Sequence, residues 1–584
     1  MVVVTPGIDL LARGFFLLSA FVAVIVSLNS LVATRLGYVV PTWIVLFATA
    51  LGIPLLSSVY ILALKFRTAR QAAAMGARVV PEVQGKMLGN LDVLKEMMDN
   101  FRNGYPGDGL DELIAAKGPV INMRVLWSDM LVTTSPEHIK TILATDFPNY
   151  VKGERFHYNM GAVLGTGVFN SDGVFHRSIT RPMFTRERIS HFELFDRKAT
   201  LVVSKIRERL REGYAFDFQD IMSRFTLDSA TEFLFGRSVE SLSAGLPYPP
   251  NASHVPQIRH TARGDAANEF ATAFLQAQIV ISMRERYGWA WPLAEMFKDE
   301  SYQPMQVVNA YIEPIVKEAL VRKKSLPPKE KGSEEEYETL LDHLVSVTDD
   351  PTVLKDEILN IMIAGRDTTA ATLTFIIYFL SIYPDVLARL REEVISKVGH
   401  TRRPDYDDVK EMKYLRAVIN GAPFNVRESI NATTWVPDDP TQKPYFIPAG
   451  TKTAYSVFMM HRRKDLWGPD AEEFDPDRFL DDRLKKYLSK NPFIFLPFNA
   501  GPRICLGQQF AYNEMSFMLI RLLQNFKTMS LDLDSAPAEA HPPAAWAQTA
   551  SGRKAIEKLV PKTHLTLYVN GGLWVKMTES DGTN

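Results

Sequence analysis

Residues 498–511 read FNAGPRICLGQQFA, and Cys505 within this stretch is the only cysteine in the 584-residue chain. A single thiol forms no internal disulfide and builds no four-ligand zinc or iron–sulfur site. Three uses are left for it: a small buried hydrophobic residue, a catalytic nucleophile, or the axial thiolate ligand of a haem. The residues that flank the cysteine bear on which use fits best.

The flanking residues favour a ligand. Gly501 and Gly507 have no side chains, so a flat, bulky cofactor has room to lie against the backbone near Cys505. An amphipathic helical pattern follows the cysteine, which places the thiol near a helix N-terminus, where partial positive charge favours the thiolate. Arg503 offers a cation to an anionic group such as a haem propionate.

Two alternatives to a haem ligand stay open on these residues alone. A catalytic nucleophile needs a base, and the fold would have to bring His176 or His461 to the cysteine. An inert core cysteine needs neither the glycines nor the arginine around it.

Two apolar segments near the start of the chain predict a membrane anchor. Residues Gly14–Thr34 and Leu36–Leu64 carry no charge, and each is long enough to cross a bilayer. We expect a retained anchor, either a two-helix hairpin or one span plus an interfacial helix, because a signal peptide has one shorter apolar core. Four basic residues between positions 65 and 78 then predict that the rest of the chain faces the cytoplasm.

The composition allows the chain to bury a large core and argues against bulk attraction to nucleic acid. Hydrophobic residues make up 46% of the chain, and 66 Lys and Arg against 67 Asp and Glu leave a net charge of −1, which argues against nucleic acid as a partner. Helical patterns dominate, while residues 120–125 and 129–134 alternate as two short strands. A cytoplasmic, reducing location agrees with the absence of disulfides.

A long helix is predicted after Asp350. Asp350 can cap it with Pro351 at its first position, and no proline recurs until Pro384, which allows a helix of about 30 residues and roughly 45–50 Å. Its middle reads IMIAGRDTTAAT (361–372), where Gly365 costs about 1 kcal/mol relative to alanine. Helix propensity therefore does not explain this stretch.

Phe498, Gly501, Arg503, Cys505 and Gly507 have the spacing Phe-x-x-Gly-x-Arg-x-Cys-x-Gly, and on these residues the chain resembles the cytochrome P450 family. AGRDT (364–368) is similar to the oxygen-activation motif of the family's central helix, and FDPDRF (474–479) to its Phe-x-Pro-x-Arg-Phe motif. The resemblance covers roughly residues 80–584 and is closest in appearance to membrane-bound fungal hydroxylases of alkanes and fatty acids.

The resemblance implies a mainly α fold with a small β-rich lobe, preceded by N-terminal transmembrane helices. We divide the chain into a membrane anchor (1–65, one or two transmembrane helices), a linker (66–95) and a haem-thiolate monooxygenase domain (96–584). The implied cofactor is haem b, with Cys505 as the axial thiolate ligand and Phe498, Gly501 and Gly507 forming its loop.

The remaining site residues follow from the same resemblance. Arg177 and Arg503 would hold the haem propionates, with Arg427 as a further candidate. Asp367 and Thr368 would deliver protons to bound oxygen, beside a local widening that Gly365 permits. Without the resemblance, Asp367 would be interpreted as a solvated carboxylate and Thr368 as a core hydroxyl. The substrate pocket would be shaped by Ala364, the loop 150–172 and the turn 571–574.

The implied reaction inserts one atom of O2 into a hydrophobic substrate of alkane, fatty-acid or aromatic type. No flavin or nicotinamide fingerprint is visible in the sequence, so electrons would come from a separate NADPH-dependent cytochrome reductase, with cytochrome b5 as a second candidate donor. The expected location is the endoplasmic reticulum membrane, with the catalytic domain facing the cytoplasm.

The chain departs from the family pattern in two places. After YLRAVIN (414–420) it passes directly to GAPFNVRES, about seven to nine residues short, and the family's Glu-x-x-Arg pair is missing. That pair contacts the arginine that maps to Arg478, so we expect this structural guanidinium to lose its partners at a cost of about 3–5 kcal/mol. Gly173 stands where the family's Trp-x-x-x-Arg motif, ending here at Arg177, has its tryptophan.

Two alternative functions remain. A haem-thiolate isomerase or lyase needs no proton relay, so Asp367 and Thr368 argue against it. A catalytically impaired, membrane-anchored remnant is the other alternative, and the two departures argue for it.

Overall fold

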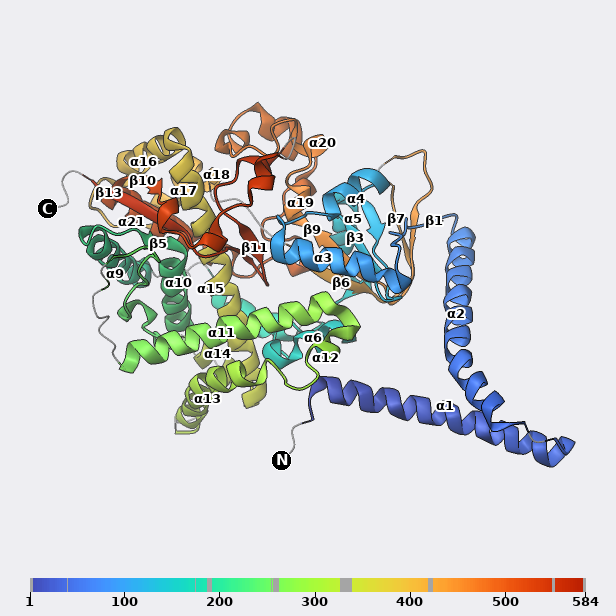
Figure 1. Ribbon diagram of the computed structural model, residues 1–584. Coiled ribbons are helices and arrows are strands. Elements are labelled where there is room, and N and C mark those ends of the chain that lie inside the picture. The colour runs from blue at the N-terminus through green and yellow to red at the C-terminus, as the bar shows by residue number, and fades with distance from the viewer. Residues whose placement is uncertain are drawn as a thin grey trace, which may run out of the picture.

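The computed structural model describes residues 4–38, 40–173, 175–185, 192–253, 255, 262–325, 339–418, 424–437, 439–548 and 552–580. Helices form most of the main body, a lobe of short strands lies beside them, and two long helices project from the body (Figure 1). The mainly α fold with a small β-rich lobe that the sequence predicts is therefore confirmed.

The α-helices of the described residues fall into three groups along the chain. The N-terminal group is α1 (Pro6–Leu36), α2 (Thr42–Ala74), α3 (Leu91–Asn103), α4 (Leu110–Lys117), α5 (Pro136–Lys140), α6 (Glu154–Leu164) and α7 (Phe175–Thr180). The middle group is α9 (Phe192–Arg211), α10 (Phe218–Phe235), α11 (Ala262–Tyr287), α12 (Trp291–Ala294), α13 (Tyr302–Ser325), α14 (Leu340–Val347), α15 (Pro351–Ile382) and α16 (Pro384–Val398). The last group is α17 (Tyr406–Glu411), α18 (Lys413–Val418), α19 (Val457–Met460), α20 (Lys464–Trp467) and α21 (Gln508–Asn525).

The largest sheet of the described residues has the strand order β2-β3-β9-β6-β4. Its strands are β2 (Val120–Asn122), β3 (Met130–Thr133), β4 (Tyr150–Val151), β6 (Phe424–Ser429) and β9 (Lys452–Ser456). The two strands predicted from alternation are thus present in a shorter form, as β2 and β3.

Three smaller sheets complete the strands of the described residues, with the orders β1-β8-β7, β10-β13-β5 and β11-β12. Their strands are β1 (Arg78–Val79), β5 (Phe216–Asp217), β7 (Thr433–Trp435), β8 (Tyr445–Ile447), β10 (Phe526–Leu531), β11 (Pro561–Thr563), β12 (Leu567–Val569) and β13 (Trp574–Glu579).

The predicted long helix is present as α15, which has 32 residues. The Asp350 side chain accepts hydrogen bonds from the backbone N–H groups of Thr352 (2.8 Å) and Val353 (3.4 Å), with Pro351 at the first helical position. One half of α15 packs with α11, α13 and α14, and the other with α9, α10 and α21. Buried residues of α15 belong to two apolar cores, one formed with each of these sets of helices. Because both cores hold the helix, the position of any side chain at the middle of α15 is fixed.

Gly365 has a different role from the one predicted. A Cβ atom at Gly365 would lie 3.4 Å from the Cβ of Ala230 in α10, so the glycine lets two core helices approach closely. The helix continues through this position without a break. The expected local widening of the helix is therefore absent.

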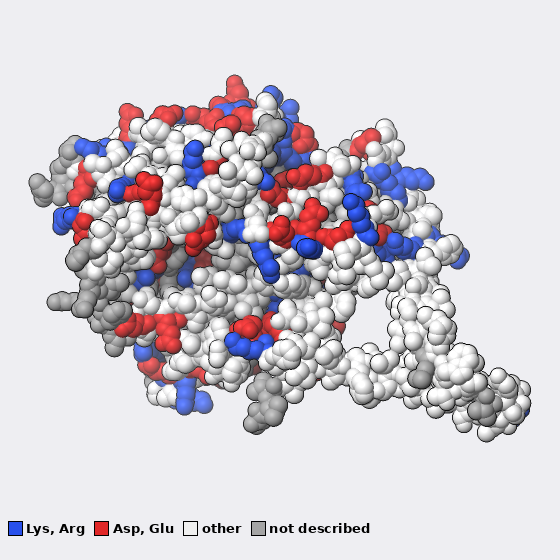
Figure 2. Space-filling model, in the orientation of Figure 1, with Lys and Arg blue, Asp and Glu red and all other residues white. Residues whose placement is uncertain are grey.

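The two apolar segments form α1 and α2, and both are long and apolar enough to cross a membrane. Figure 2 shows the projecting helices with almost no charged side chains on their surface. Helix α2 continues to Ala74, beyond the predicted boundary at residue 65, and β1 then pairs with β8 in the lobe.

His461 supports the chain just before the cysteine loop. Its imidazole is partly buried, packs against Phe495 and Trp467, and accepts a hydrogen bond from the backbone N–H of Leu496 through Nε2 at 3.0 Å. Burial, with a smaller contribution from the charge of Arg462, lowers the pKa of His461 to about 3. The side chain is therefore neutral in the folded protein at any pH near neutrality.

This depressed pKa predicts a loss of stability in mild acid. In the unfolded chain His461 has its ordinary pKa near 6.5. Its contribution to the free energy of unfolding is therefore fully present above that pH. The contribution is lost as the pH falls from about 6.5 towards 3, by about 1.4 kcal/mol per pH unit. His461→Gln keeps an acceptor for Leu496 but does not titrate, so its stability should depend less steeply on pH. Chemical denaturation midpoints between pH 7.5 and 5 measure this, and parallel pH profiles for the two proteins would contradict it.

Candidate active site

The chain from Phe498 to Cys505 forms a closed loop that leads into α21. The backbone N–H of Cys505 donates to the carbonyl oxygen of Phe498 at 2.9 Å, and that of Ile504 donates to Gly501 at 3.0 Å. The Phe498 ring packs on Tyr512 of α21 with 5.0 Å between ring centroids. These contacts hold the sulfur just ahead of the helix N-terminus, as the sequence predicts.

Gly501 is required by packing of the loop. Its φ is +62°, and a Cβ atom there would collide with the carbonyl oxygen of Leu143. The space that we assigned to a flat cofactor is therefore taken by the backbone of residues 143–144. Gly507 is less constrained, because a Cβ atom there would lie 3.5 Å from the Phe184 ring, an ordinary contact.

The Cys505 thiol borders an accessible space, yet protein atoms surround it closely enough to alter its ionisation. Burial raises its pKa, while the backbone N–H of Gly507 and the charge of Arg177 lower it in part. The net shift is upward, so the helix N-terminus alone does not produce the predicted thiolate. A cation that coordinates the sulfur would supply the missing stabilisation.

Three predicted arginines gather around this loop. Arg177 in α7 donates to the carbonyl oxygen of Ile504, and its charge acts on the Cys505 thiol. Arg427 in β6 is only 6% exposed. Burial lowers the pKa of Arg503, and the positive charges of Arg427 and Arg177 lower it further, so both of these guanidinium groups repel that of Arg503.

Lys152 joins these cations, and sequence reasoning missed it. Burial lowers its pKa well below the ordinary value, and the charges of Arg427 and Arg503 add to the shift. Asp172 is the nearest anion to Arg503, at 3.9 Å. Nothing in the local sequence marks Lys152, because the strand pairing of β4 with β6 brings it to the site. We call these four residues, Lys152, Arg177, Arg427 and Arg503, the cation cluster.

The predicted proton-handling pair lies in the middle of α15. Thr368 is exposed although both its neighbours in sequence are buried, so an accessible space lies beside the helix at this point. Its hydroxyl donates to the carbonyl oxygen of Ala364 at 2.7 Å. Asp367 is 9% exposed; one of its oxygens lies 3.5 Å from Arg366, and the other has no hydrogen-bond partner among the described residues.

A histidine near this pair was also missed. His564 lies in the turn between β11 and β12, and burial lowers its pKa while the charge of Asp367 raises it. Leu565 of the same turn packs on the apolar cluster of α15. The C-terminal turn that reaches α15 is therefore this one. Residues 571–574, which we expected to shape the pocket, pack instead on Pro537, Ala540 and Asp217.

The loop 150–172 is fastened to the first half of α15. The Asp356 carboxylate accepts from the backbone N–H (2.7 Å) and hydroxyl (3.1 Å) of Thr166. Asn360 accepts from the N–H of Phe169 at 2.8 Å and donates to the carbonyl oxygen of Leu164 at 2.9 Å. The loop predicted to shape the substrate pocket is thus held rigidly beside the site.

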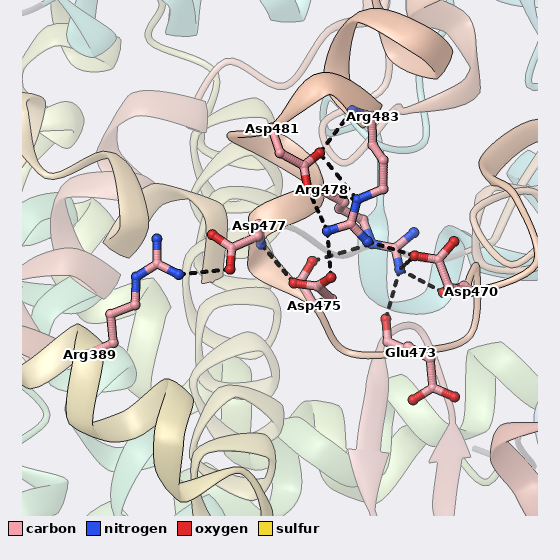
Figure 3. Close-up of polar contacts among 8 residues, drawn as sticks. All are labelled: Arg389, Asp470, Glu473, Asp475, Asp477, Arg478, Asp481 and Arg483. Atoms are coloured by element: carbon pink, nitrogen blue, oxygen red, sulfur yellow. Dashed lines mark hydrogen bonds and ion pairs between the residues drawn. The ribbon is translucent and has the colours of Figure 1, made fainter.

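Arg478 keeps partners despite the missing Glu-x-x-Arg pair. Its buried guanidinium donates to the carbonyl oxygens of Asp470 (2.6 Å), Glu473 (3.2 Å) and Asp475 (3.3 Å), all in its own loop (Figure 3). The Asp470 carboxylate lies 3.4 Å away. The expected unpaired guanidinium is therefore not found. Residues 419–423, where the Glu-x-x-Arg pair is missing, lie outside the described residues.

Arg483, which the sequence analysis did not single out, ties this loop together. It forms ion pairs with Asp470 (2.7 Å), Asp475 (2.6 Å) and Asp481 (2.7 Å), which Figure 3 shows converging on one guanidinium. The hydrogen bonds that Arg483 donates to these carboxylates raise its pKa, and the bond to Asp481 has the largest effect. Asp470 thus contacts both Arg478 and Arg483.

Comparison with known proteins agrees with this geometry. The family described as Cytochrome P450 matches residues 99–554. Cytochrome P450 52E1 of Candida apicola is 37% identical, over 72% of this chain and 80% of its own length, and Cytochrome P450 52A5 of Candida maltosa is 33% identical, over 72% and 79%. Cytochrome P450 monooxygenase himC of Aspergillus japonicus is 33% identical, over 83% and 81%.

These matches confirm the predicted resemblance and the class of haem-dependent monooxygenase, and they favour neither the isomerase or lyase alternative nor the impaired remnant. The family match covers more than half of the residues and includes the Cys505 loop, α15 and the arginines of the cation cluster. The chain belongs to the cytochrome P450 family.

Proposed function

We propose that this P450 inserts one oxygen atom of O2 into a hydrophobic substrate of alkane, fatty-acid or aromatic type, at a haem b ligated by Cys505. The observation that carries the proposal is the lone thiol, held on a closed loop beside an accessible space and within the influence of the Arg177 charge. A structural core cysteine would need no such surroundings.

The residues present fit a haem. Clustered cations that are partly or fully withdrawn from solvent destabilise one another unless anions join them, and the two haem propionates supply two negative charges. Arg177, Arg427 and Arg503 would hold the propionates, with Lys152 beside them. When bound, haem supplies the iron at which dioxygen is activated, and a thiolate ligand favours O–O cleavage.

The middle of α15 would manage protons and substrate. The Thr368 hydroxyl has its proton committed to the Ala364 carbonyl, which leaves its oxygen free to accept from water on the exposed side. The unpartnered oxygen of Asp367 can accept and return a proton. His564, whose pKa the charge of Asp367 raises, would extend this path. The small side chain of Ala364 would leave room for the substrate.

The partners and location follow from the same proposal. Electrons would come from an NADPH-dependent cytochrome reductase, with cytochrome b5 as a second candidate. The chain would lie in the endoplasmic reticulum membrane with residues 96–584 on the cytoplasmic side, joined to the anchor (1–65) through the linker (66–95). The basic residues after the apolar part of α2 support this orientation.

The two alternatives differ in what supports them. An isomerase or lyase needs no proton relay, so Asp367 and Thr368 would have no catalytic role in it. The impaired remnant rested partly on an unpaired Arg478, and the acceptors that its own loop provides remove that physical argument.

The cation cluster predicts opposite effects on the two forms of the protein. Arg427→Met keeps the apolar stem but removes a buried charge, so haem-free protein should be as stable as the unmodified chain or more so, because repulsion is relieved. Haem should be lost about tenfold faster or more, since a charge-assisted hydrogen bond is worth about 1.5–3 kcal/mol. Haem transfer to apomyoglobin and denaturation of the haem-free chain measure the two effects.

Arg403→Met is the matched control for this experiment. Arg403 is a half-exposed surface residue, and its ion pair with Glu193 is long, at 3.7 Å. It should leave both quantities unchanged. An Arg427→Met protein that retains haem as long as the control would contradict the assignment of Arg427.

The reaction itself is tested by isotope incorporation. Membranes containing the chain and a cytochrome reductase, given NADPH, 18O2 and a long-chain alkane or fatty acid, should form an alcohol with one labelled oxygen, and Thr368→Ala should consume NADPH with much less product. Product formation from a hydroperoxide without reductase or NADPH, and unchanged in Thr368→Ala, would instead establish the isomerase or lyase.

A further inference from the structure

Asn499, in the loop that leads to Cys505, has a backbone conformation that glycine adopts more readily. Its φ is +58°, in the left-handed region, where a Cβ atom crowds the following carbonyl oxygen. Gly501, two residues later, has a similar φ of +62°, and no Cβ atom fits at that position. An asparagine at a position that suits glycine indicates that its side chain is used.

The side-chain oxygen of Asn499 accepts two hydrogen bonds from the largest sheet. The phenol of Tyr455 in β9 donates to Oδ1 at 3.1 Å, and the side-chain amide of Asn425 in β6 donates to the same atom at 3.4 Å. Tyr455 and Asn425 lie directly opposite each other in the antiparallel pair of β6 and β9. Because opposite residues of such a pair share one face of the sheet, the two donors are held side by side.

The strand that carries Asn425 also carries Arg427 of the cation cluster. The two residues are two positions apart in β6, so their side chains point to the same face of the sheet. Burial raises the pKa of the Tyr455 phenol, while the positive charge of Arg427 lowers it in part, so the guanidinium lies within electrostatic reach of the phenol. The bonds to Asn499 therefore join the cysteine loop to the face of the sheet that presents Arg427.

The main donor of this connection is held rigidly. Tyr455 is fully buried, in the apolar cluster that also contains Leu496. Leu496 leads into the cysteine loop, and its carbonyl oxygen accepts from the N–H of Asn499 at 3.3 Å. In the sheet, the hydroxyl of Thr453 donates to the carbonyl oxygen of Arg427, its partner across the strands, at 3.1 Å. Close packing on both sides therefore fixes the phenol relative to β6 and the loop.

The other contacts described for the loop fix it against different parts of the protein. The N–H of Cys505 bonds to Phe498 within the loop, and the Phe498 ring packs on Tyr512 of α21. Gly501 lies on the backbone of residues 143–144. Asn499 thus supplies a connection to β6 and β9 that these contacts lack. We call Asn499, Tyr455 and Asn425 the loop clamp.

We propose that Asn499 is a positioning residue for the bond between Cys505 and the haem iron. Through the loop clamp, it holds the cysteine loop at one place relative to the strand of Arg427. A thiolate ligand and a propionate-binding cation act on the same rigid cofactor, so their separation has to match that cofactor. This inference rests on the proposed function, because it takes Cys505 as the haem ligand and Arg427 as a propionate partner.

The loop clamp is tested in haem-loaded, full-length protein. The measurement is the rate at which the reduced, carbon-monoxide-bound form loses its thiolate-type Soret band on mild heating. Tyr455→Phe removes one donor and leaves the ring in place, so the loss should be about twofold to tenfold faster, the effect of one neutral hydrogen bond. Asn499→Gly removes the acceptor at a φ that glycine adopts freely, and the loss should be at least as fast. The double variant should be no faster than Asn499→Gly, because both changes break the same contact.

Tyr378→Phe is the matched control. Tyr378 is also fully buried, at 1% exposed, and its phenol donates to Glu557, but it lies near the C-terminal end of α15, outside the loop clamp. Both tyrosine variants should unfold at a lower denaturant concentration than the unmodified chain, whereas only Tyr455→Phe should lose the thiolate-type band faster. Equal rates of band loss in the two tyrosine variants would overturn the proposal.

Hydrogen exchange gives a second measurement that does not depend on the haem ligand. The backbone N–H groups of Ile504 and Cys505, which close the loop, should exchange faster in Tyr455→Phe and Asn499→Gly than in the unmodified chain or in Tyr378→Phe. Unchanged exchange would overturn the loop clamp whatever the spectrum shows. Faster exchange, in a chain whose unmodified form lacks the thiolate-type band, would support the clamp and contradict the proposed function alone.

Discussion

The position of one sulfur atom is the constraint on which the rest of the structure depends. Cys505 ends a loop closed by its own N–H bond to Phe498, and Gly501 allows this loop to lie on the backbone of residues 143–144. Helix α21 anchors the loop from one side, while His461 supports the chain ahead of it. The long α15 crosses the same core, so the thiol and the Asp367–Thr368 pair belong to one rigid framework.

Groups around this sulfur lower the stability of the fold, and contacts further away raise it. Clustered cations that are partly or fully withdrawn from solvent, and a thiol whose pKa burial raises, disfavour the chain when it holds no cofactor. The loop before the cysteine is reinforced by Arg478 and Arg483, which share Asp470 and bind further acceptors of the same loop. Binding of a dianionic, thiolate-coordinated cofactor would convert the unfavourable cluster into ion pairs, which links folding to cofactor loading.

Local signals in the sequence predicted the features that depend on neighbouring residues. The cysteine motif, the capped start of α15 at Asp350 and the two apolar helices were all predictable because spacing, capping and hydropathy are local properties. The features that depend on distant contacts were not. Gly501 and Gly365 proved to permit backbone and helix packing, and Lys152 and His564 reach the site through strand pairing and a C-terminal turn. No local pattern distinguishes such residues from ordinary surface ones.

The central claim is that the sulfur of Cys505 ligates a haem iron. The most direct measurement is the difference spectrum of the purified, full-length protein after reduction and addition of carbon monoxide, compared with that of Cys505→Ser. The account predicts the Soret band characteristic of thiolate ligation in the unmodified protein and its loss in the variant. A thiolate-type band that survives in Cys505→Ser, or its absence from haem-loaded unmodified protein, would contradict the account.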